Sequence, residues 1–251
     1  MIRLPLLDHW PAERFPDPAE ALREPSGLLA FGGDLSPERL RAAYAQGIFP
    51  WFNEGEPILW WSPDPRCVFR TAKLCRPNRS LRRLLARCSW QVTVDRDFVG
   101  VMHACAAPRD GQHGTWISPE MIDAYATLHT RGHAHSVEVW RGASMVGGIY
   151  GVMSGRLFSG ESMFSRESGG SKVALLALAR LLHEWGCPLL DAQVANPHLL
   201  SLGAEEMPRA DYLAALRSLA AQPLDPALWA GVAPMDARHG PESTWHQDED
   251  H

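Results

Sequence analysis

The sequence predicts an α+β protein with a small N-terminal lobe and a larger C-terminal domain. The first observation is a series of three apolar runs from Ser136 to Phe164, separated by turns containing Gly142 and Gly155, a pattern typical of an antiparallel meander. The second is the helix, strand and helix pattern that follows. The third is the first third of the chain, rich in Pro, Gly and Trp with one clear helix. Helices that follow a meander indicate the α+β class.

The N-terminal lobe is expected to contain one helix and a set of packed loops. Ser36 is placed as the N-cap of this helix, Pro37 takes its first position, and Gly47 is placed to end it. The stretches 47–52 and 58–66 have too much proline for regular structure and too many aromatic residues for a solvated linker. They predict aromatic-walled loops that pack against the protein.

The remaining elements follow in order along the chain. A short helix is expected over 81–85, a strand over 90–94, and a helix that opens at Ser118 and turns Ile122, Tyr125 and Leu128 inward. The meander is expected over 136–140, 145–150 and from 156 onward. After it we expect a long apolar helix over 171–185, a buried strand over 188–193 and a helix over 212–219. We therefore divide the chain into a lobe (1–95), a catalytic domain (96–235) and a disordered acidic tail (236–251).

Composition excludes several classes of protein. Among the 251 residues, 45% are hydrophobic, enough for a sizeable core. The sequence contains neither an apolar run of about 18 residues nor a secretion signal, so we expect a cytoplasmic protein without a membrane anchor. The five cysteines are scattered without a Cys-x-x-Cys pair and are expected to be reduced thiols.

Charge is distributed unevenly. The formal net charge is −5, yet the segment from Arg66 to Arg87 contains eight basic residues and no acidic one. A basic segment close to Trp60, Trp61 and Trp90 favours a polyanion such as nucleic acid. The alternative is a solvated basic face without a partner.

Two carboxylates and an amide form the main candidate site. Glu161 follows the third meander segment, and Asp191 and Gln193 lie two positions apart, which places them on one face of the predicted strand. Buried groups of this kind need hydrogen-bond partners, which favours a site. In the alternative interpretation, Asp191 caps a turn and Glu161 pairs with a surface arginine.

Other motifs give weaker signals. His133 and His135 share a strand face, but without an obvious third ligand they do not predict a metal site. His198 is expected to make structural hydrogen bonds in its loop. Neither a Gly-x-Ser-x-Gly elbow nor a phosphate-binding Gly-Lys-Ser/Thr loop is present.

Several long blocks together resemble the bacterial leucyl/phenylalanyl-tRNA–protein transferase family. They occur in that family's order and span roughly residues 2–215: GLLAFGGDLSP (27–37), GIFPWF (47–52), PILWWSPDPR (57–66), GTWI (114–117), GHAHSVEVW (132–140), GESMFS (160–165) and DAQ (191–193).

This resemblance implies a C-terminal domain with an acetyltransferase-like (GNAT-superfamily) fold and a specific reaction. Leu or Phe, and less readily Met, would pass from leucyl-tRNA or phenylalanyl-tRNA to the N-terminal amine of proteins that begin with Arg or Lys, marking them for degradation. Residues 166–171 match the acetyltransferase pyrophosphate loop poorly, so neither acetyl-CoA nor any other cofactor is expected, and we expect a monomer. The rival hypotheses are an acyl-CoA N-acyltransferase and an inactive tRNA- or peptide-binding adaptor.

The resemblance also implies roles for individual residues. Asp191 and Gln193 would relay the proton from the attacking amine, and Glu161 would help to hold the acceptor; which carboxylate binds the basic acceptor side chain stays open. We expect Asp191→Ala to fold normally and transfer slowly. The terminal adenosine would contact Trp51, Trp116 and Tyr44, and tRNA phosphates would contact Arg79, Arg82 and Arg83. The aminoacyl pocket would consist of Ile149, Gly160, Met163, Leu175, Leu178, Leu182 and Leu190.

Overall fold

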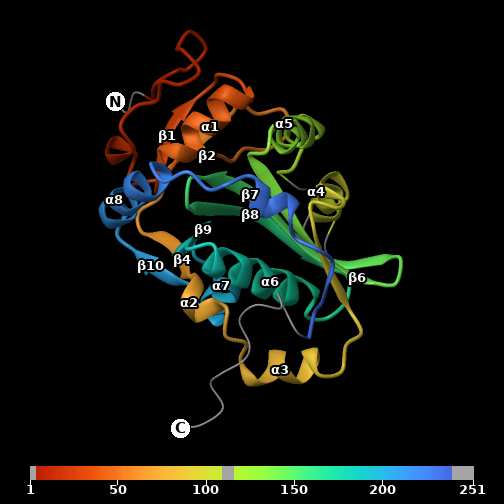
Figure 1. The fold of residues 1–251 in the computed structure, drawn as a ribbon. Coiled ribbons are helices and arrows are strands. Elements are labelled where there is room, and N and C mark those ends of the chain that lie inside the picture. The colour runs from red at the N-terminus through yellow and green to blue at the C-terminus, as the bar shows by residue number, and fades with distance from the viewer. Residues whose placement is uncertain (1–3, 109–115, 239–251) are drawn as a thin grey trace.

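The computed structural model describes residues 4–108 and 116–238. Most of its strands belong to one eight-stranded sheet (Figure 1). The strand order is β10 (Glu205–Met207), β4 (Arg66–Arg70), β9 (Leu189–Gln193), β8 (Leu157–Ser165), β7 (Ser144–Ser154), β6 (Ala134–Arg141), β5 (Gln91–Val94) and β11 (Met235–Asp236). Strands β8 and β9 are parallel, whereas the other neighbours are antiparallel. This mixed sheet with its helices confirms the α+β class.

The predicted meander and the elements after it are present. Strands β6, β7 and β8 pair in sequence and are longer than predicted. Helix α6 (Gly170–Glu184) then connects β8 to β9, and nearly all of its side chains are buried. Gly186 follows the helix with φ of +72°, a conformation that glycine adopts without strain.

The N-terminal segment contains the predicted helix but more regular structure than expected. Helix α1 (Pro37–Ala45) begins after Ser36, whose hydroxyl accepts a hydrogen bond from the Arg39 amide. The expectation of irregular loops was wrong, because these stretches contribute to a three-stranded sheet of β1 (Leu28–Phe31), β3 (Leu59–Trp61) and β2 (Phe49–Pro50). Its strands are short, and Pro50 lies in an edge strand, where proline is tolerated.

Strand β4 is a further element that the sequence patterns did not predict. It lies between β9 and β10, with Cys67, Val68 and Phe69 buried. Strands β4 and β5 belong to the large sheet, although both precede the predicted boundary at residue 95. The division into a lobe and a catalytic domain therefore stays a prediction. At the other end, Asp236 belongs to β11, and the predicted tail lies outside the described residues from position 239 onward.

Three further helices agree with or extend the sequence patterns. Helix α5 (Pro119–Thr130) begins after Ser118 and buries Ile122, Tyr125 and Leu128 as predicted. The short helices predicted near 81–85 and 212–219 are α3 (Arg79–Leu85) and α8 (Arg209–Ala220). The sequence patterns did not predict five other helices: η1 (Pro18–Glu20), α2 (Thr71–Leu74), α4 (Phe98–Ala106), α7 (Pro197–Ser201) and α9 (Ala227–Ala230).

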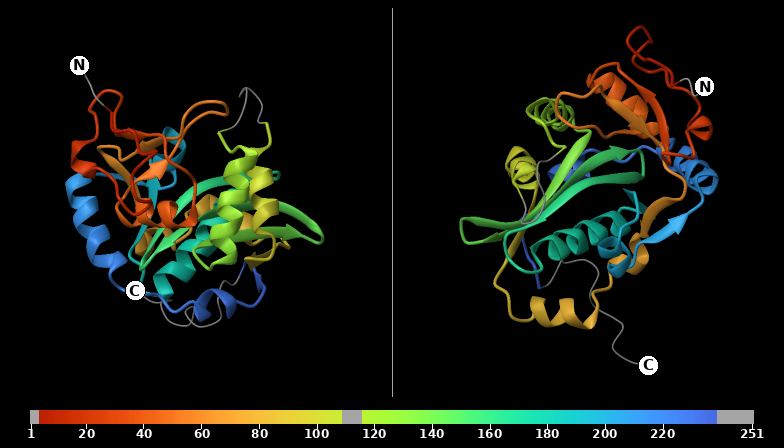
Figure 2. Two further views of the ribbon diagram at one scale, coloured as in Figure 1. Left: turned by 90° about the horizontal axis from the view of Figure 1, so that it is seen from above. Right: turned by 180° about the vertical axis from the view of Figure 1, so that it is seen from behind.

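The large sheet is covered on both faces (Figure 2). Helix α6 packs on one face, with α3 outside it, and α1, α4, α5 and the small sheet cover the other. One apolar cluster joins Leu40 and Trp60 of the N-terminal segment to Tyr150 and Phe164 of the large sheet. A search of the described ranges found that none of their helices has both the length and the apolar character required to cross a bilayer.

Candidate active site

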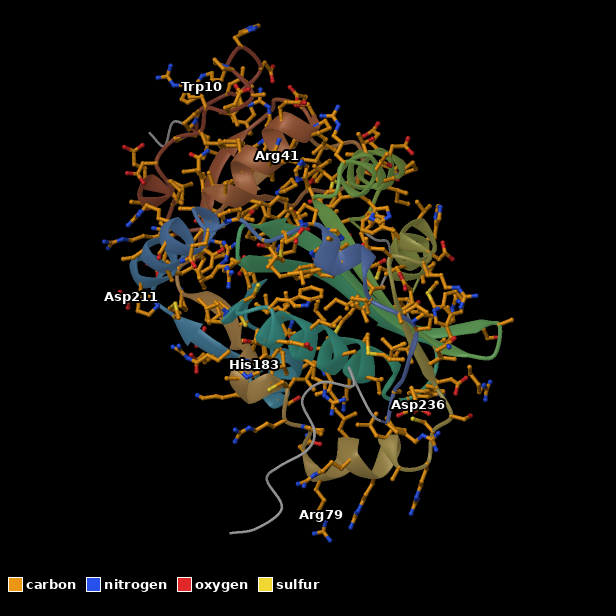
Figure 3. All side chains as sticks on the ribbon, viewed as in Figure 1. Trp10, Arg41, Arg79, His183, Asp211 and Asp236 are labelled. Carbon is orange, nitrogen blue, oxygen red and sulfur yellow. The ribbon has the colours of Figure 1, made fainter. Side chains whose placement is uncertain are left out.

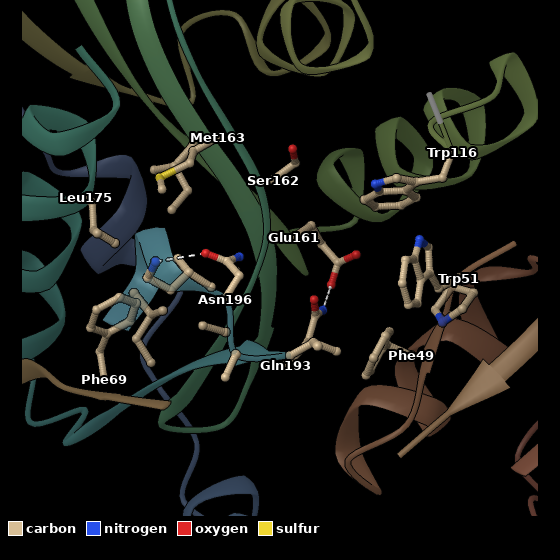
Figure 4. Close-up of a pocket in the computed structure, with 18 residues that line it drawn as sticks. Phe49, Trp51, Phe69, Trp116, Glu161, Ser162, Met163, Leu175, Gln193 and Asn196 are labelled. Carbon is tan, nitrogen blue, oxygen red and sulfur yellow. Dashed lines mark hydrogen bonds between the residues drawn. The ribbon is translucent and has the colours of Figure 1, made fainter. Parts of the chain in front are cut away.

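A cavity of about 320 Å³ lies where β8, β9 and α6 meet the N-terminal segment (Figure 4). Its polar lining includes Glu161 and Gln193, which lie between an apolar part and an aromatic part in Figure 4. In the described part of the chain, Glu161 is the one carboxylate that lines it. A concave apolar site with few polar groups is the usual form of a small-ligand pocket.

The apolar part contains most of the residues predicted for an aminoacyl pocket. Ile149, Gly160, Met163, Leu175 and Leu190 line the cavity. Leu178 and Leu182 do not; both are fully buried in α6 within the core behind it. All three leucines share one face of α6, so the difference lies along the helix axis: the cavity reaches Leu175 near the start of α6 but not the later positions 178 and 182.

The aromatic part contains both predicted tryptophans. Trp51 follows β2 and is 45% exposed, and Trp116 precedes α5. Figure 4 shows their rings on the same side of the cavity. The backbone carbonyl of Trp51 accepts a hydrogen bond of 2.7 Å from Nε1 of Trp61. An exposed indole at a cavity mouth is suited to stacking on a planar ring.

Asp191 lies beside the cavity but does not line it. Arg66 donates to both of its carboxylate oxygens, from Nε at 2.8 Å and from Nη2 at 2.6 Å. Tyr212 and Ser159 donate through their hydroxyl groups at 2.9 and 3.2 Å. Both members of the Arg66–Asp191 pair are almost fully buried, so the Asp191 charge is neutralised and fully hydrogen-bonded within the fold.

Asp191 and Gln193 do not share one strand face as the spacing predicted. Gln193 has a left-handed backbone with φ of +61°, and the pairing of β9 with β4 shifts register between them. This bulge reorients the Gln193 side chain. Asp191 Oδ1 accepts a hydrogen bond of 2.9 Å from the Gln193 backbone amide, which is the turn-capping contact of the alternative interpretation.

The side chain of Gln193 is instead bonded to Glu161. Gln193 Nε2 donates to Glu161 Oε1, as the dashed line in Figure 4 shows. Burial raises the pKa of the Glu161 carboxyl to about 7, and the charge of Asp191 acts in the same direction, while hydrogen bonds from Tyr44, Gln193 and Tyr125 oppose the shift. Glu161 therefore exchanges its proton near neutral pH, as a catalytic acid or base must.

Tyr44 and Tyr125 form a hydrogen-bonded pair next to Glu161. Their hydroxyl groups bond to each other, and Tyr125 donates to Glu161 Oε2 at 3.4 Å. Tyr44 is 1% exposed and does not line the cavity. The contact predicted between Tyr44 and the terminal adenosine is therefore corrected, because a buried ring is not accessible for stacking.

The basic residues predicted to contact tRNA phosphates lie on α3, outside the cavity. Arg79, Arg82 and Arg83 are exposed, and Figure 3 shows Arg79 extending away from the protein. Sequence charge alone was sufficient to identify this surface, because it requires no long-range pairing.

The histidines lie elsewhere. His135, but not His133, lies with Asp95 and His129, and their potential ligand atoms are within 4.8 Å of one another. His135 Nδ1 is 2.7 Å from Asp95 Oδ2, and His129 Nδ1 is 2.8 Å from the Ala134 carbonyl. A hydrogen bond therefore engages Nδ1 of each of these two histidines. His198 is exposed on α7 and does not line the cavity.

Several lining residues had no signal in the sequence. Phe69 comes from β4, Asn196 follows β9, and Leu199 belongs to α7. The apolar run Cys67-Val-Phe69 is a local signal that could have suggested a buried strand, but its pairing with β9 cannot be deduced from local pattern.

Comparisons with known proteins match this chain over most of its length. A family model described as leucyl/phenylalanyl-tRNA protein transferase matches residues 68–217, and the model for the N-terminal domain of that transferase matches residues 33–64. A leucyl/phenylalanyl-tRNA–protein transferase from Xanthomonas axonopodis pv. citri (strain 306) is 59% identical over 227 residues, covering 90% of this chain and 91% of the relative. The corresponding protein of Xylella fastidiosa (strain 9a5c) is 56% identical over 226 residues, covering 90% and 93%. Among solved structures, the crystal structure of FemX has a TM-score of 0.42 at 13% identity, covering 68% of this chain and 66% of that chain.

Proposed function

The chain belongs to the leucyl/phenylalanyl-tRNA–protein transferase family, whose members are aminoacyltransferases, and from this premise we propose what it transfers and to which acceptor. Leu or Phe, and Met less readily, passes from aminoacyl-tRNA to the N-terminal amine of proteins that begin with Arg or Lys. One observation carries the proposal: an apolar cavity adjoins the hydrogen-bonded pair of Glu161 and Gln193.

The donor side chain occupies the apolar part of the cavity. Its walls are aliphatic apart from Met163, Phe69 and Asn196, and the Asn196 side-chain oxygen already accepts a hydrogen bond from the Leu199 amide, so the walls make little polar demand on Leu or Phe. Methionine is flexible and polarizable, which allows one site to fit guests of different shape. The terminal adenosine stacks on Trp51 and Trp116 at the mouth, where base stacking contributes about 1–3 kcal/mol.

The reaction exchanges one acyl bond for another. The amine nitrogen forms a bond to the ester carbonyl carbon, the ester C–O bond breaks, and the ribose hydroxyl leaves with a proton. An N-terminal amine has a pKa near 8, so it is mostly protonated at neutral pH and must lose a proton before it attacks.

Glu161 receives that proton, and Gln193 orients the amine. The Gln193 amide donates to Glu161, which leaves its carbonyl oxygen as an acceptor for an N–H group of the substrate. Glu161 is the base, with a pKa of about 7 because of its burial. Asp191 holds the Gln193 backbone in place and acts as a positioning residue.

Glu161 also carries the negative charge that faces the acceptor. A cationic first residue needs an anionic partner, and Glu161 is the carboxylate among the described lining residues. Glu161→Gln is therefore expected to reduce the preference for an Arg peptide over an Ala peptide.

The other expectations from the sequence remain part of this proposal. The meander, α6 and the parallel strand β9 support an acetyltransferase-like fold, with tRNA replacing acetyl-CoA as the acyl donor. We also propose that the enzyme is a monomer. Charged tRNA is cytoplasmic, so the reaction takes place in the cytoplasm. The added residue marks the product for degradation.

The test is transfer of radiolabelled leucine from leucyl-tRNA to a peptide that begins with Arg, beside the same peptide beginning with Ala. Label on the Arg peptide alone is expected. No label on either peptide while tRNA still binds would favour the adaptor. Acyl transfer from acetyl-CoA in place of leucyl-tRNA would favour an ordinary acyltransferase.

A further inference from the structure

A second cavity, of about 370 Å³, adjoins the candidate active site. Leu175 of α6 lines both cavities. The second one lies between the residues around the start of α3 and the first turns of α6, and we call it the α3–α6 cavity. Its polar lining consists of Lys73, Arg76, Asn78, Ser80, Ser168 and Lys172.

The α3–α6 cavity has a positive lining. Three of its residues are basic, and none of those described is acidic. Lys73 is 3.4 Å from Glu205, whereas neither Arg76 nor Lys172 forms an ion pair within residues 4–108 and 116–238. A lining with unneutralised cations and no carboxylate attracts anions.

Helix stability does not explain Lys172. It is the third residue of α6, and a cation in the first turn opposes the helix dipole. A basic side chain at this position is therefore better explained by a negatively charged partner than by the helix itself.

The α3–α6 cavity lies between the aminoacyl pocket and the basic helix α3. On one side, Leu175 separates it from the aminoacyl pocket. On the other side, α3 packs closely against the start of α6: a Cβ built on Gly169 would lie 2.3 Å from Leu84 Cδ2. The exposed residues Arg79, Arg82 and Arg83 continue from this contact along α3.

We propose that the α3–α6 cavity binds phosphate groups of the single-stranded 3′ end of the donor tRNA, with Arg76 and Lys172 as the contacts. This inference rests on the proposed function, which locates the terminal adenosine at Trp51 and Trp116. The nucleotides before that adenosine must connect the active site to the stem, and each carries a phosphate. Arg76 and Lys172 contact the backbone and do not distinguish the bases.

Two minimal donors test the proposal. Leucyl-adenosine lacks the preceding phosphates, whereas a CCA trinucleotide esterified with leucine contains them. For Arg76→Ala with Lys172→Ala, the KM for leucyl-CCA is expected to rise about tenfold, since hydrogen bonds to charged groups contribute on the order of 1.5 kcal/mol or more. The KM for leucyl-adenosine and the kcat with either donor stay unchanged. The control, Arg23→Ala with Arg217→Ala, removes two exposed cations elsewhere.

An unchanged KM for leucyl-CCA would overturn the proposal, as would an equal rise for both donors, which would indicate a distorted pocket. Binding of the uncharged CCA trinucleotide, followed by fluorescence anisotropy, gives a second measurement that needs no transfer. A chain that binds CCA through Arg76 and Lys172 but transfers nothing would contradict the proposed function alone. Equal CCA affinity in the wild type and the double variant would contradict the phosphate site alone.

Discussion

At the scale of single residues, Glu161 connects the polar groups of the active site. Its carboxylate accepts hydrogen bonds from Gln193 and Tyr125, and Tyr44 lies behind Tyr125. Arg66 and Asp191 influence the same group through their charges. The proton equilibrium of Glu161 therefore depends on residues from four elements besides its own strand.

The pH dependence of transfer should report this environment. Because the pKa of Glu161 is raised to about 7 and the base acts when deprotonated, transfer should increase with pH through about 7. Glu161→Gln should lower kcat by about a hundredfold, a typical general-base contribution, and remove this step. Tyr125→Phe deletes a hydrogen bond that stabilises the carboxylate, so the midpoint should move upward by roughly half a pH unit or more.

The comparison is made in single-turnover assays between pH 6 and 8 with one acceptor peptide, so that the titration of its amine is common to all variants. Tyr150→Phe is the control, since no hydrogen-bond partner of the buried Tyr150 hydroxyl is found among the residues that the structure describes. A wild-type midpoint in Tyr125→Phe would mean that this hydroxyl does not act on Glu161.

Asp191 should matter for stability at least as much as for rate. Removing it leaves Arg66 as an unpaired charge at 1% exposure, and breaking a buried pair costs about 3–5 kcal/mol. Asp191→Ala should therefore lower the free energy of unfolding by about that amount, measured by urea denaturation, which revises the expectation that it folds normally.

A second change separates this effect from catalysis. Replacing Arg66 by Leu in the same variant removes the unpaired charge and should restore part of the lost stability. Glu205→Ala breaks an exposed pair with Arg70 and should change stability by less than about 1 kcal/mol. Wild-type stability in Asp191→Ala would show that the ion pair does not stabilise the fold.

The sequence predicted that Glu161, Asp191 and Gln193 lie close together, but not which groups each of them bonds to. Their arrangement depends on the left-handed backbone of Gln193 and the register shift beside β4. Neither feature has a local signal in the sequence, since both arise from pairing with a strand more than a hundred residues away.

At the scale of elements, helices were easier to predict than strands. Helices α1, α5 and α6 follow local capping and periodicity, and the structure confirms them. Strand β4 has arginine at both ends and no polar alternation, and it is recognisable only from its neighbours β9 and β10. The aromatic segments of the small sheet were missed for the same reason.

The close packing of β7, β8 and α6 allows pocket shape to be tested separately from stability. A Cβ added at Gly160 would meet its nearest atoms at 3.6 Å, an ordinary contact, and would project among cavity residues. Gly160→Ala should keep the wild-type urea midpoint yet raise the KM for phenylalanyl-tRNA more than that for leucyl-tRNA, because the larger ring needs the space.

The matched variant is Gly147→Ala on β7. There a Cβ would lie 2.3 Å from the Gly170 backbone of α6, so overpacking should destabilise the protein by about 1–3 kcal/mol without changing the Leu-to-Phe ratio. A parallel rise of both KM values in Gly160→Ala would argue against a side-chain pocket at this position.

Helix α3 should contribute to tRNA affinity in a salt-dependent way. Arg82→Glu with Arg83→Glu should raise the KM for leucyl-tRNA, and the slope of log affinity against log salt should become shallower by about one for each tRNA phosphate that the variant no longer neutralises. The control is Arg23→Glu with Arg217→Glu, which changes the net charge by the same amount but on other exposed surfaces. Equal effects of the two pairs would attribute the change to net charge alone.

At the scale of the whole molecule, the two sheets share one core. The same apolar cluster contains Trp60 of the small sheet and Phe164 of the large one. Polar contacts also join them: Arg66 Nη1 donates to the Gly47 carbonyl at 3.0 Å, and Arg209 Nη1 donates to the Ser62 carbonyl at 2.6 Å. A boundary drawn from composition could not anticipate this sharing.

This shared core predicts that the protein unfolds in one cooperative step. If the N-terminal segment were an independent lobe, its amides would exchange at lower urea concentrations than those of the large sheet. We expect instead that native-state hydrogen exchange gives similar opening free energies for Ala30 in β1 and Tyr150 in β7, both fully buried. Asp191→Ala should lower both values equally, because Arg66 contacts Gly47 as well as β9. A lower value for Ala30 alone would establish separate folding units, and the active site between them would then depend on how firmly the two units are held together.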